Sequence, residues 1–218
     1  MGTQAGKATQ EQILQFMTTE HFTLQTARSA TIAEANGRSA LYLGSVSSAV
    51  VALAFVGQVS DMGGAFFLFG IVLFPSLFFL GIVTFDRVLQ TSLEDIIHAR
   101  EINRIRHYYI ELAPEIGRYF LHSTHDDEAG SFQNMGIVPS KWQPFLTTAG
   151  MVAVINSVIA GVFAAMALKF ALSLTNYACA GLGVPVFVVS VVLHRHFGLK
   201  KSTQVTSKLE TLFPSRSK

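Results

Sequence analysis

Two long apolar runs decide the fold, and they lie in tandem in residues 39–85, SALYLGSVSSAVVALAFVGQVSDMGGAFFLFGIVLFPSLFFLGIVTF. No Asp, Glu, Lys or Arg occurs between Arg38 and Asp61, and none occurs between Asp61 and Asp86. At a rise of about 1.5 Å per residue, each run is long enough to cross the roughly 30 Å hydrocarbon core of a bilayer as a helix. Residues 61–64, Asp-Met-Gly-Gly, separate the runs, so the stretch predicts a transmembrane hairpin.

The composition of the whole chain agrees with this prediction. Of the 218 residues, 50% are hydrophobic and only 14% are charged, which is too apolar for an ordinary soluble domain. The single cysteine, Cys179, excludes an intramolecular disulfide. No glycine-rich phosphate loop, nucleophile elbow or pair of catalytic carboxylates is present, so we expect neither an enzyme nor a bound cofactor.

A second hairpin is predicted for residues 145–193. Residues 145–168 carry no charge, the turn falls at 173–176, and the fourth run covers 177–193. Lys141 and Trp142 precede it as a cation and an amphipathic ring, a pair typical of the headgroup level. The sequence therefore predicts an all-α, polytopic membrane protein with four transmembrane helices arranged as two hairpins.

The charged residues predict the orientation and the remaining segments. Of the 16 Lys and Arg residues, three precede the first run, six lie between the hairpins and six follow the last run, whereas neither turn contains one. The positive-inside rule then places both termini and residues 86–144 in the cytoplasm, as in a multi-pass protein of a bacterial inner membrane. We expect an amphipathic helix in residues 1–38, begun by a capping box at Thr9 and Gln12 and jointed at Asn36-Gly37. Residues 86–144 should form a cytosolic helix that ends before Pro114, with a loop after it, and residues 194–218 a basic tail.

Small residues recur at every fourth position in the first run of each hairpin. These two ridges are Ala40, Gly44, Ser48 and Ala52, and Ala149, Ala153, Ser157, Gly161 and Ala165. Such ridges let membrane helices approach closely, so we expect the first run to pack inward, with Gly44 and Gly161 at the closest contacts. The Phe-rich second run, kinked at Pro75, should face lipid.

Asn156 is the most informative polar side chain within the runs. Burying a carboxamide in the middle of a transmembrane helix is energetically unfavourable unless the group is hydrogen-bonded or hydrated. Asn156 therefore either bonds across helices or lines a narrow pore. Pore lining and helix packing are both open for the candidate residues Gly44, Ser48, Asn156, Ser157 and Gly161. No ionisable residue lies deep in any run, which argues against a proton-coupled transporter.

The helix after the first hairpin carries a group of basic residues, Arg100, Arg104, Arg106 and His107. One interpretation is a contact with an anion, such as a nucleotide phosphate, a lipid headgroup or an acidic protein. The other, which we favour, is pairing with the nearby carboxylates Glu94, Asp95, Glu101 and Glu111.

One cluster has the residue types of a metal site, namely His122, His125, Asp126, Asp127 and Glu128. His-x-x-His brings two imidazoles near each other, and the carboxylates have the chemistry to complete a site. The acidic residues lie in a predicted polar loop, and the sequence offers no second pair of metal ligands elsewhere. We therefore expect a solvated loop and no bound metal. His194-Arg195-His196 is interpreted as an anchor at the membrane edge.

The layout resembles a known class. A helix with spaced His21, Arg28, Glu34 and Arg38 runs into a hairpin that begins Tyr42-Leu-Gly and exits as a long charged helix. Over roughly residues 15–110 this is similar to SLATT modules, bacterial two-helix membrane effectors associated with nucleotide signalling and thought to form pores. This chain adds a second hairpin, and it also resembles uncharacterised four-helix bacterial integral membrane proteins.

The resemblance, together with the ridges, implies a homo-oligomeric channel or pore-forming effector gated by its cytosolic helices. The alternative is a non-conducting structural or accessory subunit of a larger membrane complex. Expected partners are the lipid bilayer, further copies of the chain, and a cytosolic protein or nucleotide ligand. No nucleic acid is expected.

Overall fold

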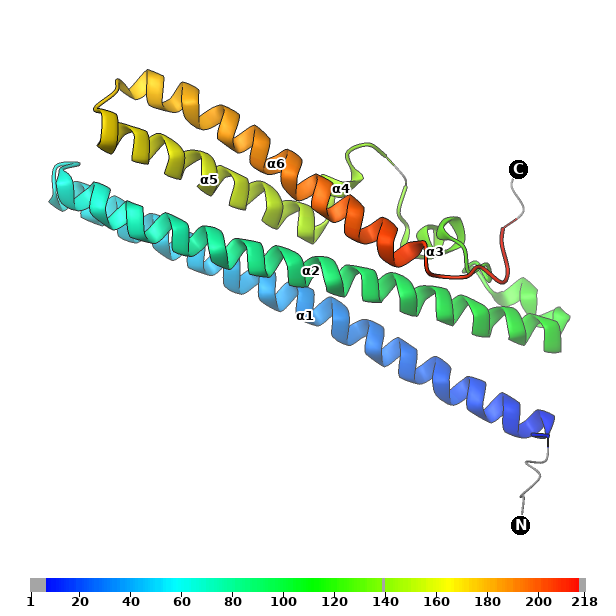
Figure 1. Ribbon diagram of the computed structural model, residues 1–218. Coiled ribbons are helices and arrows are strands. Elements are labelled where there is room, and N and C mark those ends of the chain that lie inside the picture. Colours follow the sequence, from blue (N-terminus) through cyan, green and yellow to red (C-terminus); the bar gives the residue numbers. More distant parts are fainter. Residues whose placement is uncertain (1–6, 139, 216–218) are drawn as a thin grey trace, which may run out of the picture. The chain divides into compact units, whose positions relative to one another are not determined.

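The computed structural model describes residues 7–138 and 140–215, and every regular element in these residues is a helix (Figure 1). Residues 1–6, which belong to the expected N-terminal helix, and Arg216 and Lys218 of the expected basic tail lie outside the described residues. The elements are α1 (Gln10–Val59), α2 (Gly64–Leu112), the 3-10 helix η1 (Pro114–Tyr119), α3 (Glu128–Met135), α4 (Gln143–Leu146), α5 (Thr148–Leu172) and α6 (Asn176–Thr206).

Four of these helices, α1, α2, α5 and α6, are long and apolar enough to cross a membrane. The chain is therefore all-α and has the composition of a multi-pass membrane protein. The described residues form two compact units. The charged unit contains residues 7–32, 94–138 and 210–215, and the apolar unit contains residues 33–93 and 140–209.

Helix α1 begins with the predicted capping box. The backbone N–H of Gln12 donates to Thr9 Oγ1 at 3.3 Å, and the N–H of Thr9 donates to Gln12 Oε1 at 2.9 Å. The predicted joint at Asn36-Gly37 is wrong, because α1 continues unbroken through both residues. The cost of a helical glycine is only about 1 kcal/mol, and the Arg38–Glu34 ion pair one turn apart bridges the position.

Two short turns connect the long helices of the apolar unit. After α1, Asp61 and Met62 adopt left-handed conformations with φ of 47° and 55°, although the sequence offers glycines in the next two positions. After α5, Ser173 takes the left-handed position with φ of 51°, and the Thr175 hydroxyl then accepts from the N–H of Ala178 to begin α6. The Lys169 ammonium donates to the carbonyl of Leu174 and closes this second turn.

The core of the apolar unit corrects the predicted roles of the first two runs. Helix α2, expected to face lipid, buries a stripe at three- and four-residue spacing, namely Gly70, Phe74, Leu77, Gly81, Phe85 and Val88. The small-residue ridge of α1 is exposed instead, while Tyr42 and Ala49 on another side of α1 enter the core. The expected direction was wrong because α2 also carries small residues, Gly70 and Gly81, at its buried contacts. Helix α2 runs through Pro75, which lies on its exposed side.

The charged unit has a small core of its own. Leu24 of α1 packs with Ile102 and Ile105 of α2, and an ion pair from Arg28 Nε to Asp95 Oδ1 at 2.7 Å flanks them. His21 stacks on Tyr109 with ring centroids 5.9 Å apart. These contacts hold the N-terminal part of α1 against the C-terminal part of α2.

Candidate functional site

A hydrogen-bonded network of polar side chains, Tyr42, Asn156 and His194, crosses the core of the apolar unit; we call it the polar chain. Asn156 of α5 is fully buried; its Oδ1 accepts from the Tyr42 hydroxyl of α1 at 3.3 Å, and its Nδ2 lies 3.4 Å from His194 Nε2 of α6. His194 Nδ1 in turn lies 2.8 Å from the carbonyl oxygen of Ser190. Asn156 thus bonds across three helices, which is the first of the two roles that the sequence leaves open for it.

The partners of the two ring nitrogens indicate the tautomer of His194. Its Nδ1 faces a carbonyl oxygen and must donate, so Nε2 is left to accept from the Asn156 amide. Asn156 Oδ1 then accepts from Tyr42, and every member of the chain has a partner.

Glycines let the helices close around this polar chain. A Cβ built at Gly81 of α2 would collide with the Asn156 side chain and come within 2.8 Å of the Tyr42 hydroxyl. The His194 ring meets Phe85 of α2 edge to face, with centroids 4.9 Å apart. Helix α2 therefore packs against all three residues of this network, through Gly81 at Tyr42 and Asn156 and through Phe85 at His194.

Besides Asn156, the four candidate residues on the two ridges fall into two groups. Gly161 contacts α6, where a Cβ would lie 2.9 Å from the carbonyl oxygen of Gly183, and the buried Ser157 hydroxyl donates to the carbonyl of Ala153 in its own helix. Gly44 and Ser48 are exposed on α1, and no atom lies within 4 Å of a Cβ built at Gly44. Of the two glycines expected at close contacts, only Gly161 makes one within the chain.

Charged residues gather where the apolar runs end. Glu34 accepts from Arg38 Nε at 2.8 Å and from Arg87 Nε at 2.9 Å, and these hydrogen bonds, that from Arg87 first, lower the pKa of Glu34 to about 2. Asp86 accepts from Gln90 and from Lys201 of α6. Glu34 therefore stays ionised over the physiological pH range.

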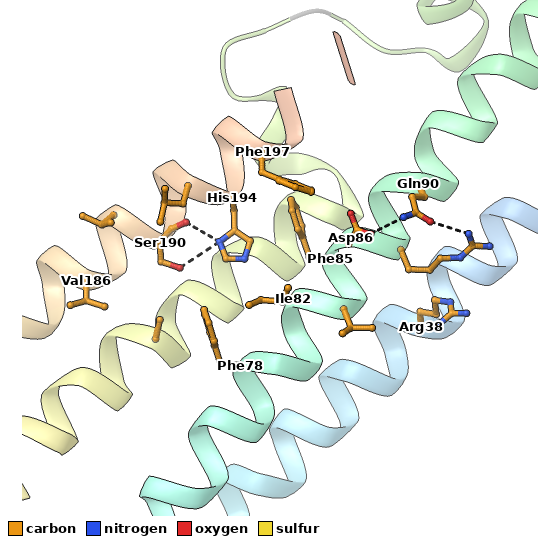
Figure 2. A pocket seen from close by; sticks show the side chains of 15 residues that line it. Arg38, Phe78, Ile82, Phe85, Asp86, Gln90, Val186, Ser190, His194 and Phe197 are labelled. Carbon is orange, nitrogen blue, oxygen red and sulfur yellow. Dashed lines mark hydrogen bonds between the residues drawn. The ribbon is translucent and has the colours of Figure 1, made fainter. Parts of the chain in front are cut away.

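An elongated groove lies between these charges and the polar chain. It has a volume of about 830 Å³ and runs between α2 and α6, with Ser190, His194 and Phe85 along its wall and Arg38 at its charged end (Figure 2). Apolar side chains line most of it, including Phe78, Ile82, Val83, Val186, Val189 and Leu193. The groove thus has an apolar body and a charged end.

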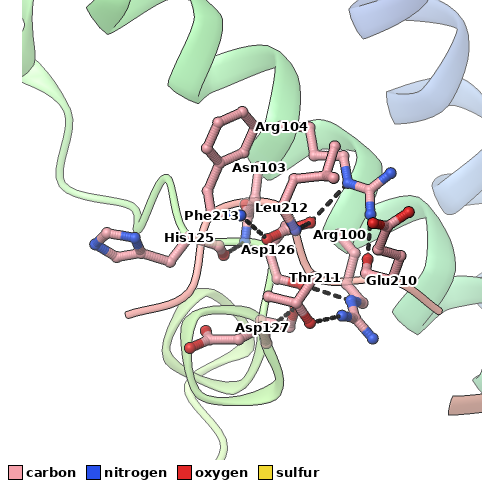
Figure 3. A network of polar contacts seen from close by, with 11 residues as sticks. Arg100, Asn103, Arg104, His125, Asp126, Asp127, Glu210, Thr211, Leu212 and Phe213 are labelled. Atoms are coloured by element: carbon pink, nitrogen blue, oxygen red, sulfur yellow. Dashed lines mark hydrogen bonds and ion pairs between the residues drawn. The ribbon is translucent and has the colours of Figure 1, made fainter. Parts of the chain in front are cut away.

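In the charged unit, two of the candidate arginines bind a buried aspartate and the C-terminal segment (Figure 3). Arg104 Nε donates to Asp126 Oδ2 at 2.7 Å, and Arg100 donates to the carbonyl of Asp126 and to the Thr211 hydroxyl at 2.7 Å. The Asp126 carboxylate also accepts the backbone N–H groups of Leu212 and Phe213, at 3.0 and 2.8 Å. We call this set of contacts the tail clasp.

A second aspartate extends the tail clasp. Asp127 caps α3 by accepting from the N–H of Gly130, and its other oxygen accepts from the N–H and the hydroxyl of Ser215. Burial raises the pKa of both aspartates. The hydrogen bonds that they accept, including the one from Arg104 to Asp126, lower it by more, so the pKa of each aspartate lies below its usual value. Both carboxylates are held ionised, as the clasp requires.

The remaining two candidates lie beside the tail clasp. Arg106 donates to Asn103 Oδ1 at 3.2 Å, and burial and then Arg28 lower its pKa. His107 stacks on Phe213 with ring centroids 3.8 Å apart and lies 3.6 Å from Glu111. Of the predicted pairs with nearby carboxylates, the one between His107 and Glu111 is thus present. Arg100 and Arg104 instead contact residues far along the chain, and the sequence did not predict these contacts.

The interpretation of residues 125–131 as a solvated loop is wrong for its central residues. Asp126 has no exposed surface, Asp127 caps a helix, and the His125 carbonyl accepts from Asn103 Nδ2 at 2.8 Å. Among residues 7–138 and 140–215, no group of three His, Cys, Asp or Glu side chains is arranged to hold a metal ion. The acidic residues of this segment instead organise the C-terminal segment.

Sequence reasoning missed His194 and Asp126 as members of buried networks. His194 carries a weak signal, because it follows Ser190 by one turn at the end of an apolar run. Asp126 carries none, since its partners lie in a segment 86 and 87 residues further along the chain.

Comparisons of this chain with protein families, with curated proteins and with solved structures found no match. The resemblance to SLATT modules accordingly rests on the helix layout alone.

Proposed function

We propose that this protein is a multi-pass protein of a bacterial inner membrane, with its four apolar helices arranged as two transmembrane hairpins. Both termini and residues 86–144 lie in the cytoplasm in this proposal. The absence of Lys and Arg from residues 60–63 and 173–175, against six between the hairpins and six after the last, supports this orientation.

We propose further that copies of the chain assemble into a channel through the exposed ridge of α1. The observation that carries this proposal is the open surface at Gly44, where small residues and the exposed hydroxyls of Ser47 and Ser48 occur in a charge-free helix. Because the ridge of α5 is used inside the chain, the ridge of α1 is left for a neighbouring copy. The tail clasp then supplies a cytosolic element whose opening gates the channel.

Reconstitution of the purified protein into liposomes tests this function. We expect the wild-type protein to pass monovalent ions and to elute as an oligomer in mild detergent. Gly44→Leu should lose both properties, because the added side chain separates neighbouring copies. Gly181→Leu is the matched control, since Gly181 is an equally open glycine of α6. Ion flux that is equal in the two variants would contradict a pore built on α1.

The second candidate is a non-conducting subunit of a larger membrane complex. The hydrogen bonds that join Tyr42, Asn156 and His194 favour it, because Tyr42 and Asn156 are buried and their polar atoms are used in bonds between helices. Under this alternative the liposomes pass no ions, and the protein co-purifies with a fixed partner from native membranes.

The topology has its own test. In a Cys179→Ala background, Met62→Cys and Thr175→Cys should react with a membrane-impermeant thiol reagent added to intact cells, because both positions are exposed in the short turns. Lys208→Cys should react only after lysis. Labelling of the two turn positions only after lysis would contradict the orientation.

A further inference from the structure

We infer that the groove between α2 and α6 is a binding site for one anionic phospholipid, with the acyl chains in its apolar body and the phosphate at Arg38. The inference rests on the proposed membrane insertion of these helices. It goes beyond general contact with a bilayer, because it assigns one site, one orientation and a preference of headgroup charge.

The position of the groove along the helices is the first observation that supports a lipid site. Arg38 precedes the first charge-free run, Asp86 ends the second, and His194 follows the fourth. All three line the groove, so its charged end lies where the apolar runs stop. A phospholipid has the same order of parts, with apolar chains below a charged headgroup at the membrane surface. The groove therefore matches a lipid in its direction as well as in its lining.

The ion pairs at the charged end of the groove are the second observation that supports a lipid site. Ion pairs join three cations, Arg38, Arg87 and Lys201, to two carboxylates, Glu34 and Asp86, at this end of the groove. Lys201 and Asp86 pair with each other, and Glu34 keeps two bonds from Arg87 without Arg38. Arg38 is therefore the cation that can turn to a headgroup while Glu34 and Asp86 each keep a cationic partner.

Arg38 is also placed to use its charge. Its side chain is 47% exposed, and its Nε donates to Glu34 Oε1 at 2.8 Å. A guanidinium fork of this kind binds phosphate oxygens through charge-assisted hydrogen bonds. The groove body, at about 830 Å³, has room for acyl chain segments beside Phe78 and Val189.

Native mass spectrometry of the purified full chain in detergent tests the inference. With phosphatidylglycerol and phosphatidylcholine added in equal amounts, we expect one phosphatidylglycerol to be retained about tenfold more tightly. Arg38→Gln should remove this preference, whereas Arg195→Gln, at an exposed cation of the same boundary that does not line the groove, should keep it. Equal retention of both lipids by the wild-type protein would overturn the inference.

A second pair of variants tests the groove body. Val189→Phe fills the groove and should reduce retention of both lipids, while Val192→Phe, on the same helix and similarly exposed at 58% against 57%, should not. Equal retention by the two variants would place the lipid elsewhere. Binding of glycerol 3-phosphate as tight as that of phosphatidylglycerol would overturn the inference in favour of a soluble phosphate ligand.

These results are separable from the proposed channel. A protein that prefers phosphatidylglycerol but passes no ions supports the lipid site and counts against conduction. A protein that conducts ions without any lipid preference overturns the lipid site alone.

Discussion

Asp126→Asn should release the C-terminal segment from the charged unit. The change keeps the size of the side chain but replaces a carboxylate that accepts three hydrogen bonds, from Leu212, Phe213 and Arg104, with a neutral amide. Whichever way the amide turns, its NH2 group faces a donor, and Arg104 loses its charged partner. Residues 210–215 should therefore spend more time undocked.

The size of this effect follows from the burial of Asp126, whose side chain has no exposed surface. A hydrogen bond to a charged group contributes about 1.5–3 kcal/mol, and breaking a buried ion pair costs about 3–5 kcal/mol. Because Arg104 is 35% exposed and can turn to water, we take the lower end, about 3 kcal/mol. This corresponds to an increase of about 100-fold in the opening equilibrium of the segment.

Hydrogen exchange of the Leu212 and Phe213 amides measures that equilibrium directly. We expect about 100-fold faster exchange in Asp126→Asn and little change in the helices α5 and α6. Glu101→Gln is the control, because Glu101 is an exposed carboxylate of α2 outside the tail clasp. Exchange within threefold of the wild-type rate in Asp126→Asn would refute the assignment of Asp126 as the residue that holds the segment.

Three further predictions concern packing and pH. Gly161→Leu should lower the melting temperature in detergent by several degrees, because a Cβ at this position lies 2.9 Å from the Gly183 carbonyl oxygen. Overpacking of this kind costs about 1–3 kcal/mol. A melting curve equal to that of the control Gly181→Leu would contradict this prediction. Tyr42→Phe should destabilise the protein by about 1 kcal/mol in denaturant titrations, because Asn156 Oδ1 loses its donor; no change would show that the bond contributes nothing. Burial, and then Arg106, lower the pKa of His21, so its contribution to stability is present above the ordinary histidine pKa of about 6.5 and is lost as the pH falls below it. Thermal unfolding of the charged unit between pH 7.5 and 5.5 should show this loss, His21→Gln should reduce it, and an identical pH profile in that variant would contradict the cause.

Long-range contacts separate what the sequence predicts from what it does not. The helices were predictable because a charge-free run, a cap at Thr9 and a stop at Pro114 are local signals. The partners of Asn156 were not, because Tyr42 lies 114 residues away and His194, just after the fourth run, lies 38 residues away. The inner face of α2 was misassigned for a related reason, since a Phe-rich helix suits lipid and core equally well, and only the contacts at Gly70 and Gly81 distinguish them.

The most direct test of the proposed channel is modification of α1 during conduction. Ser48→Cys, in a Cys179→Ala background, should place its thiol on the pore axis, so a cationic methanethiosulfonate reagent should reduce ion flux through reconstituted protein. Val50→Cys is the control, because two residues along a helix turn the side chain by about 200° and Val50 is also exposed. The proposal predicts block at Ser48→Cys and none at Val50→Cys. Flux that is unchanged by the modification of both positions, or no flux at all from the unmodified protein, would contradict it.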